Sequence, residues 1–321
     1  MPSTAVQTFT DPDAYFAGIR NLQIDGLVLR HGKFWAKSTR IDLHRLWMHR
    51  FQENLPRIMK VTPSGTRAGV LFAIRPAQSA MQLNGIETSQ NQIATFGLNR
   101  DWYHRSSAPC EWGTMSLTRE DLADASETII GRELVRTTFV GSLAPPVNAL
   151  SRLRNLHEAA GHLAETAPDI LLKPQVARAI EQALVEAMVF CLADSYSNGV
   201  RNVQRHRARV MRRLEEVLRA NPKKPLYMAD LSAKVGASYW TLRDCCLEYL
   251  DMSPKRYLWL RRMHLARRAL RRADAEGTTV TEIATDHGFW ELGRFSVAYR
   301  SLFGETPSTT LRRTPDNPRT L

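Results

Sequence analysis

The sequence predicts an α+β protein in which a β-rich N-terminal domain with some helices is followed by an all-α domain. Three observations predict this class. Short runs rich in Val, Ile, Phe or Trp, separated by turn residues, fill the region from residue 20 to about residue 118. Beyond that region, apolar residues recur mostly at helical spacing. The length of 321 residues also favours two domains over one.

The N-terminal strands are expected to be short and closely spaced. Examples are residues 27–31, 46–51, 69–74 and 92–96. Many short strands with little chain between them favour a small barrel or a sandwich over a parallel sheet, which needs long crossover connections.

Helices are expected to follow these strands. Thr118, with acidic residues just after it, is typical of a helix start, and helical patterning resumes over residues 147–166. A longer helix that begins at Pro174 has a broad apolar face. Packing of that face within its own domain is the simpler interpretation, and packing on a second subunit is the alternative.

A polar stretch at residues 194–201 is expected to separate the two domains. We therefore expect a first domain over residues 1–198, a second over residues 200–313, and a flexible tail over residues 314–321.

The positive charge of the chain is concentrated in its last part. The whole chain has a net charge of +12, and residues 201–321 hold 24 basic and 13 acidic residues, which gives +11. Such an excess suggests a polyanionic partner such as nucleic acid, or an anionic membrane surface, whereas a merely solvated basic face is the alternative. We see no membrane span, signal peptide or disulfide framework, and therefore expect a cytoplasmic protein.

One pattern occurs twice in the C-terminal region. In each copy a short amphipathic run ends at a glycine, Gly236 or Gly288, and a second amphipathic run follows. Glycine readily adopts the positive φ of a tight turn, so the copies predict two helix-turn-helix units, at residues 228–250 and 279–303. In the second copy, Thr279 and Glu282 predict a capping box.

A single helix is expected between the two units, from Pro254 to about Arg272, with Ser253 as its cap. These 19 residues would span about 28 Å, close to the roughly 34 Å of one DNA turn. Such a spacer would let both units enter successive major grooves.

Residues from about 205 to 313 resemble the DNA-binding domain of the AraC/XylS family of bacterial transcription regulators. The resemblance is carried by SPKRYLWLRRMHLARRAL (253–270), TVTEIATDHGFWELGRFSVAYRSLFGETPS (279–308) and the weaker ADLSAKVGASYWTLRDCCLEYL (229–250). Within the family, residues 288–311 are similar to the branch that contains the ethanolamine-operon activator. In this family the other domain is often a cupin-like barrel that binds a small effector, dimerises, or does both.

The resemblance places DNA-binding residues on the second helix of each unit. They are Tyr239, Trp240, Arg243 and Asp244 in the first unit, and Leu292, Gly293, Arg294, Val297 and Arg300 in the second. Arg243 and Arg294 are the best candidates to donate two hydrogen bonds to guanine, and Trp240 to touch a thymine methyl group. Arg300 is either a phosphate contact or part of a solvated face.

The first unit departs from the family pattern at Asp244, at Asp251 and at Tyr227, which stands where a capping Thr or Ser is usual. We therefore expect the first unit to be less stable, or to read its site less tightly, than the second.

Other candidate sites are weak. Six aromatic residues could line an effector pocket, although a place in the core is the simpler interpretation: Trp35, Trp47, Phe72, Trp102, Tyr103 and Trp112. The vicinal pair Cys245-Cys246 lacks further ligands nearby, and His44 and His49 would lie on opposite faces of one strand. With no catalytic motif either, we expect no catalytic residues, no metal and no cofactor.

The sequence therefore predicts a sequence-specific DNA-binding transcription regulator, not an enzyme. The resemblance implies a small-molecule-responsive activator, a homodimer that binds a promoter and contacts RNA polymerase. The alternatives are a ligand-independent or architectural DNA-binding protein and, less favoured, an enzyme tethered to DNA.

Overall fold

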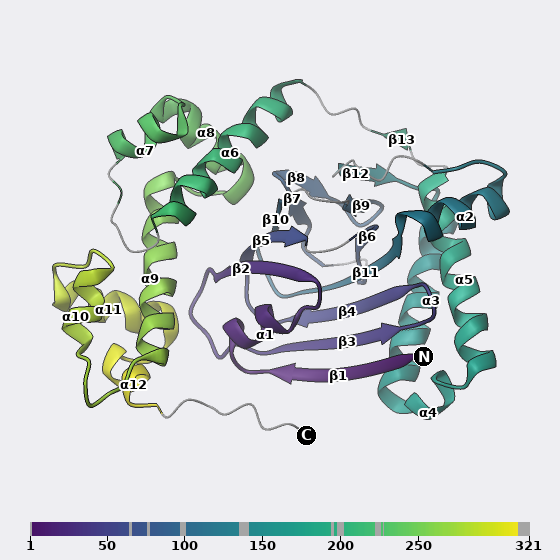
Figure 1. Ribbon diagram of the computed structural model, residues 1–321, viewed down its shortest axis with the longest axis horizontal. Helices are drawn as coiled ribbons and strands as arrows, with labels where there is room; N and C mark the ends of the chain where they lie inside the picture. Colours follow the sequence, from purple (N-terminus) through teal and green to yellow (C-terminus); the bar gives the residue numbers. More distant parts are fainter. Residues whose placement is uncertain are drawn as a thin grey trace. The chain divides into compact units, whose positions relative to one another are not determined.

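The computed structural model describes residues 2–63, 66–75, 78–96, 101–134, 141–193, 196–197, 202–221, 226 and 228–313. The chain forms two compact units (Figure 1). The first comprises Met1–Gly26 and Phe34–Val200, and the second comprises Leu27–Lys33 and Arg201–Leu321. Tyr227, the tail at 314–321 and most of the 194–201 stretch lie outside the described residues.

The first unit contains two open antiparallel sheets, so the β-rich expectation is confirmed without closure into a barrel. The larger sheet has the strand order β1 (Ser3–Phe9), β3 (Ala36–Asp42), β4 (Trp47–Glu53), β11 (Cys110–Thr118), β6 (Arg67–Ala73), β9 (Ile93–Phe96), β12 (Gly141–Ala144) and β13 (Tyr196–Ser197). The smaller sheet has the order β2 (Leu22–Val28), β5 (Arg57–Pro63), β10 (Trp102–Ser106), β7 (Met81–Leu83) and β8 (Ile86–Thr88).

One expected strand is displaced. The strand predicted over 27–31 instead spans Leu22–Val28, and its alternate residues Leu22 and Ile24 both line a cavity between the two sheets. The strands predicted at 46–51, 69–74 and 92–96 overlap β4, β6 and β9.

The described residues of the first unit form the helices α1 (Pro12–Gly18), α2 (Arg119–Ile130), α3 (Val147–Thr166), α4 (Pro168–Leu171) and α5 (Pro174–Ala193). The bounds of α3 are those predicted, and the Thr118 side chain caps α2 by accepting from the Asp121 amide at 3.1 Å.

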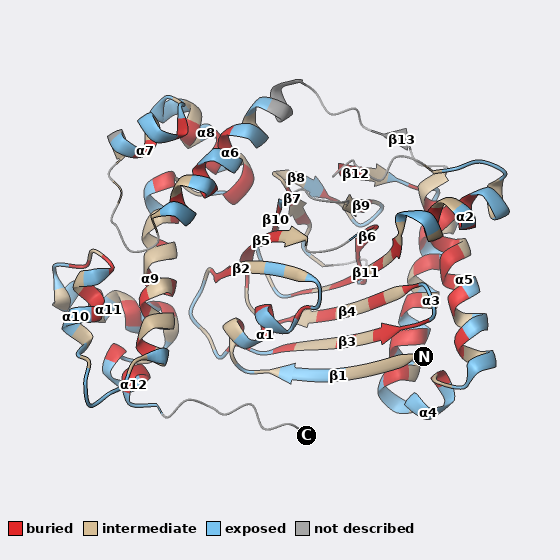
Figure 2. Ribbon diagram, in the orientation of Figure 1, coloured by how far each residue is buried: buried red, intermediate tan, exposed pale blue. Residues whose placement is uncertain are grey.

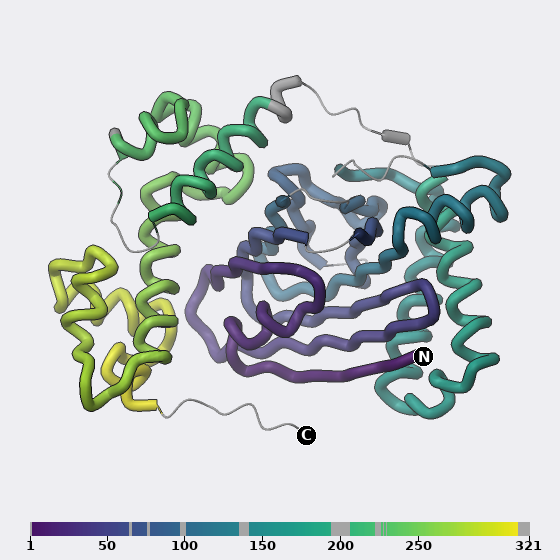
Figure 3. The backbone as a smooth tube through the Cα atoms, in the orientation of Figure 1, coloured from purple at the N-terminus to yellow at the C-terminus, as the bar shows by residue number. Residues whose placement is uncertain are grey.

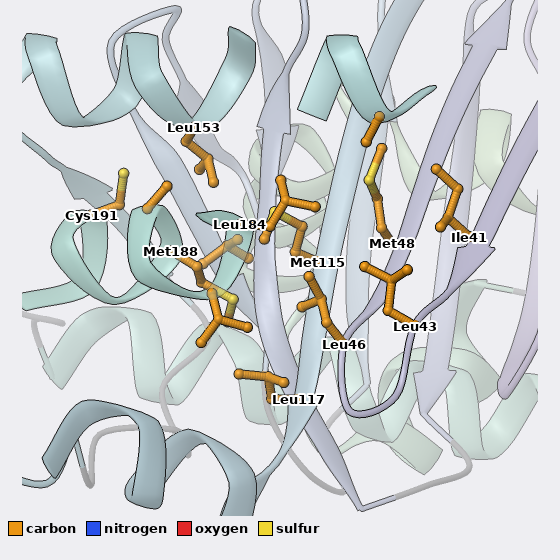
Figure 4. Packing of buried hydrophobic residues seen from close by; sticks show 14 of the residues in the cluster. Ile41, Leu43, Leu46, Met48, Met115, Leu117, Leu153, Leu184, Met188 and Cys191 are labelled. Carbon is orange, nitrogen blue, oxygen red and sulfur yellow. The ribbon is translucent and has the colours of Figure 1, made fainter. Parts of the chain in front are cut away.

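The apolar face of α5 is used within its own unit. Leu184 and Met188 on this helix belong to the same buried cluster as Met48 of β4 and Met115 of β11 (Figure 4). Buried residues accordingly follow the sides of α3 and α5 that meet the sheet (Figure 2). The simpler of the two interpretations of this face is therefore confirmed.

The described part of the second unit is helical from Asn202 to Arg312. Its helices are α6 (Asn202–Ala220), α7 (Met228–Val235), α8 (Tyr239–Leu250), α9 (Pro254–Arg272), α10 (Val280–Asp286), α11 (Leu292–Phe303) and α12 (Pro307–Arg312). No helix among the described residues is long and apolar enough to cross a membrane.

Candidate nucleic-acid interface and effector cavity

The first repeat folds as a helix-turn-helix. Gly236 has a φ of +68° and its amide donates to the Ser232 carbonyl at 2.9 Å, which ends α7. Ser238 then caps α8, since its side chain accepts from the Thr241 amide at 3.1 Å. Leu242 and Leu250 are fully buried on the inner side of α8.

The second repeat has the same construction. Gly288 takes a φ of +76° after α10. The predicted capping box is present: the Thr279 amide donates to Glu282 at 2.7 Å, and the Glu282 amide donates to the Thr279 hydroxyl at 3.2 Å. Phe295 and Tyr299 form the buried stripe of α11.

Helix α9 connects the two repeats and packs on helices of both. It is 19 residues long and is capped by Ser253, as predicted. It contacts α8 of the first repeat and α10 of the second, and the two repeats lie near its opposite ends (Figure 3). The Arg262 guanidinium donates to the Gly288 carbonyl at 3.2 Å, which ties α9 to the second turn. The second unit therefore holds two helix-turn-helix elements on one rigid spacer.

The predicted DNA-binding residues lie on the solvent-facing sides of α8 and α11. Trp240 is 67% exposed, Val297 is 73% exposed and the side chain of Arg294 is 84% exposed. Tyr239, Asp244, Gly293 and Arg300 are also exposed, whereas Arg243 and Leu292 are half-buried. Contact of these residues with DNA stays a prediction.

The two candidate guanine-reading arginines are paired with neighbouring carboxylates. Arg294 lies 2.9 Å from Glu291, and Arg243 lies 3.6 Å from Asp244. Both pairs are solvent-exposed, and such pairs contribute little to stability. Each arginine can therefore leave its carboxylate partner for another hydrogen-bond acceptor at little cost in free energy.

Trp290 is a candidate to which the sequence patterns assigned no role. It directly precedes Glu291, the N-cap of α11, and is 72% exposed. The signal available in the sequence was a large aromatic residue between the turn glycine and the second helix. That its side chain is exposed to solvent becomes apparent only in the folded structure.

A cavity in the first unit lies between its two sheets. Its volume is about 70 Å³, and it opens to solvent. Ten of its wall residues, from both sheets and from the segment after α1, are Ile19, Arg20, Ile24, Trp47, His49, Phe51, Arg67, Trp102, His104 and Trp112. A mostly apolar concave site with few polar groups is typical of small-molecule binding.

Half of the six aromatic candidates line this cavity. Trp47, Trp102 and Trp112 do so. Phe72 belongs to the core cluster instead, Tyr103 is buried away from the cavity, and Trp35 is partly exposed. The sequence could not separate these groups because both kinds of position need large apolar side chains.

The polar groups of the cavity are cationic or neutral. The guanidinium carbons of Arg20 and Arg67 lie 4.2 and 4.0 Å from the centre of the Trp47 ring. Burial lowers the pKa of His49 to about 4, and burial also lowers the pKa of His104. Both imidazoles are therefore neutral at pH 7. His44 lies in the turn before β4, so only His49 is on that strand, contrary to expectation.

A buried polar network fixes one wall of the cavity. Glu53 accepts hydrogen bonds from Tyr15 at 2.5 Å and from the indole of Trp112 at 2.8 Å. Its other oxygen lies 2.6 Å from Nε of Arg57, and both charged side chains are fully buried. The network therefore holds the Trp112 ring in place against the cavity.

The four cysteines, Cys110, Cys191, Cys245 and Cys246, are buried free thiols. Burial raises the pKa of Cys110 and of Cys191 to about 12, and it raises the pKa values of Cys245 and Cys246 as well.

We expect none of these thiols to react with iodoacetamide in the folded protein. A raised pKa leaves the thiol protonated at pH 8, and burial blocks access to it. Mass spectrometry should show no label under native conditions and four labels after denaturation. Rapid native labelling at Cys245 or Cys246 would contradict the burial described for these two thiols.

Comparison with known proteins places a family match on the second unit. Residues 231–313 match the model of the family described as a helix-turn-helix domain. This segment contains α8 to α12 and most of α7. Residues 231–313 are thus a helix-turn-helix domain, in agreement with the predicted pair of repeats.

Curated relatives are bacterial transcription regulators. The chain is 28% identical over 219 residues to a probable thc operon regulatory protein of Rhodococcus erythropolis, a match covering 68% of this chain and 65% of the relative. It is 38% identical over 105 residues to XylDLEGF operon transcriptional activator 1 of Pseudomonas putida, covering 33% of this chain and 30% of the activator. The chain thus spans less than two thirds of these relatives.

A solved structure, that of the AraC-like transcriptional activator CuxR, aligns with 88% of this chain and all of its own. The two are 16% identical, with a TM-score of 0.45.

Proposed function

We propose that this chain is a transcription regulator of the AraC/XylS type that binds specific DNA sequences through α8 and α11. The observation that carries the proposal is the pair of helix-turn-helix elements on α9, each with an arginine in the first half of its second helix, half-buried Arg243 on α8 and exposed Arg294 on α11. Residues 200–313 form the DNA-binding domain in this proposal. The net charge of +11 over residues 201–321 suits a phosphate backbone.

Residues 1–198 sense a small molecule in this proposal, and the cavity between the two sheets is the binding site. It supplies an aromatic wall and a few polar groups, as small-molecule sites do. Ligands that raise the melting temperature of the wild-type protein should fail to do so in Thr114→Trp, because Thr114 lines the cavity and a larger side chain fills it. Equal shifts in both proteins would place the ligand elsewhere.

The remaining parts of the proposal follow the resemblance to the family. The protein is a cytoplasmic homodimer that activates transcription by contacting RNA polymerase at a promoter. The likeness of residues 288–311 to the ethanolamine-operon branch supports only a proposal of common descent, and we infer no ligand from it. No described feature favours an architectural protein or a tethered enzyme.

Arg294→Ala tests the DNA-reading role directly. Loss of two hydrogen bonds to a guanine should cost about 1–3 kcal/mol on the preferred site and relax the preference at one base pair. Fluorescence anisotropy on the preferred site and on random DNA measures both effects. Arg152→Ala is the control, since Arg152 is an exposed arginine of the first unit paired with Glu186. An equal loss on both DNAs would show that Arg294 contacts only phosphate.

A further inference from the structure

In the described part of the second unit, large apolar side chains are exposed only around the two candidate reading helices. Among its described residues these are Tyr239, Trp240, Leu247, Trp290 and Val297. All five lie on α8, on α11 or directly before α11. Exposed apolar side chains gathered in this way mark a binding surface more often than a solvated one.

Two of these residues, Trp290 and Val297, lie with exposed Gly293 at the start of α11, and we call these three the apolar reading surface. Gly293 and Val297 are four residues apart and lie on the same side of the helix. Phe295 and Tyr299 are buried on the opposite side. Arg294 is exposed next to Gly293, so the surface borders a cationic hydrogen-bond donor.

Gly293 has no packing reason to be glycine. A Cβ atom added there would meet nothing within 4 Å. Its φ is not in the left-handed range, and glycine weakens a helix relative to alanine. Close approach of a partner to the helix explains the residue, because a missing side chain lets another molecule reach the backbone.

We propose that the apolar reading surface contacts the C5-methyl groups of thymines that flank the guanine read by Arg294. The thymine methyl is the apolar group that base pairs display in the major groove. The proposal rests on the proposed function, since it requires α11 to lie in that groove. DNA is favoured over a protein as the occupant because the surface borders Arg294 and belongs to a strongly basic region.

The test uses the full chain and the site that it selects from random DNA. Each thymine of the half-site assigned to α11 is replaced in turn by deoxyuridine, which removes only the methyl group. At one or two positions the wild-type affinity should fall about fourfold, the loss expected for one buried methyl group. Val297→Ala should bind the unmodified site less tightly than the wild type does. At one of those positions, replacement of thymine by deoxyuridine should then lower the affinity of this variant little further, because the contact with the methyl group is already missing.

Two further variants separate contact from folding. Trp290→Ala should melt at the wild-type temperature, because the side chain is 72% exposed, yet should bind the site several-fold less tightly. Gly293→Ala should be at least as stable as the wild type but should bind less tightly, because its methyl group occupies the approach path.

Deoxyuridine that changes no affinity, or Trp290→Ala and Val297→Ala that bind like the wild type, would overturn the proposal. An unchanged DNA affinity combined with lost transcription activation would assign the surface to a protein partner and would also overturn it. If the full chain selects no site at all, the proposed function fails instead, so the two failures are distinguishable.

Discussion

Arg57→Met is expected to lower the free energy of unfolding by about 3–5 kcal/mol. Removal of the guanidinium leaves the Glu53 carboxylate fully buried beside the cavity without its charge partner, which lies 2.6 Å away in the wild type. Tyr15 and Trp112 still donate to this carboxylate, but two neutral donors do not replace a positive charge. A urea titration of the full chain followed by tryptophan fluorescence measures the change.

Two controls define the origin of this effect. The double variant Glu53→Leu/Arg57→Met should recover part of the loss, because it removes both buried charges together. Arg152→Met breaks an exposed pair with Glu186 and should change stability by about 1 kcal/mol or less. If Arg57→Met is no less stable than Arg152→Met, the buried pair does not hold the first unit together as described.

Phe295→Ala is expected to unfold the second helix-turn-helix and to abolish specific DNA binding. Phe295 is buried in an aromatic row between Phe289 at 4.8 Å and Tyr299 at 5.6 Å, measured between ring centres. Truncation of a buried phenylalanine costs about 3–5 kcal/mol, which is large for a small helical element. Differential scanning calorimetry and DNA-binding titrations report the two losses.

Val297→Ala is the matched control on the same helix. Its side chain is 73% exposed, so the melting temperature should stay close to that of the wild type even if DNA affinity falls. A wild-type melting profile for Phe295→Ala would contradict the packing described for α11.

The sequence predicted best what depends on neighbouring residues. The bounds of α3, the capping box of Thr279 and Glu282, and the turn at Gly236 all follow from local spacing and local hydrogen bonds. The duplicated pattern made the prediction of two helix-turn-helix units stronger, because the same signals recur in the same order in both copies.

The first unit was harder to predict because its site depends on distant pairings. Glu53 ends β4 and Arg57 begins β5, so their spacing of four residues reflects a turn between two sheets and not a helix. Arg20 and Arg67 meet at Trp47 only after three separate segments have folded. No spacing rule along the chain identifies such contacts.

The most direct test of the central claim is selection of binding sites from a random DNA pool, with the wild-type chain, Arg243→Ala and Arg294→Ala in parallel. The account predicts that the wild type enriches two short blocks separated by about one turn of DNA, roughly 10 base pairs. Each variant should then relax one block and leave the other intact. Tight, salt-sensitive binding without any enriched sequence, or variants that alter neither block, would contradict bipartite reading by α8 and α11.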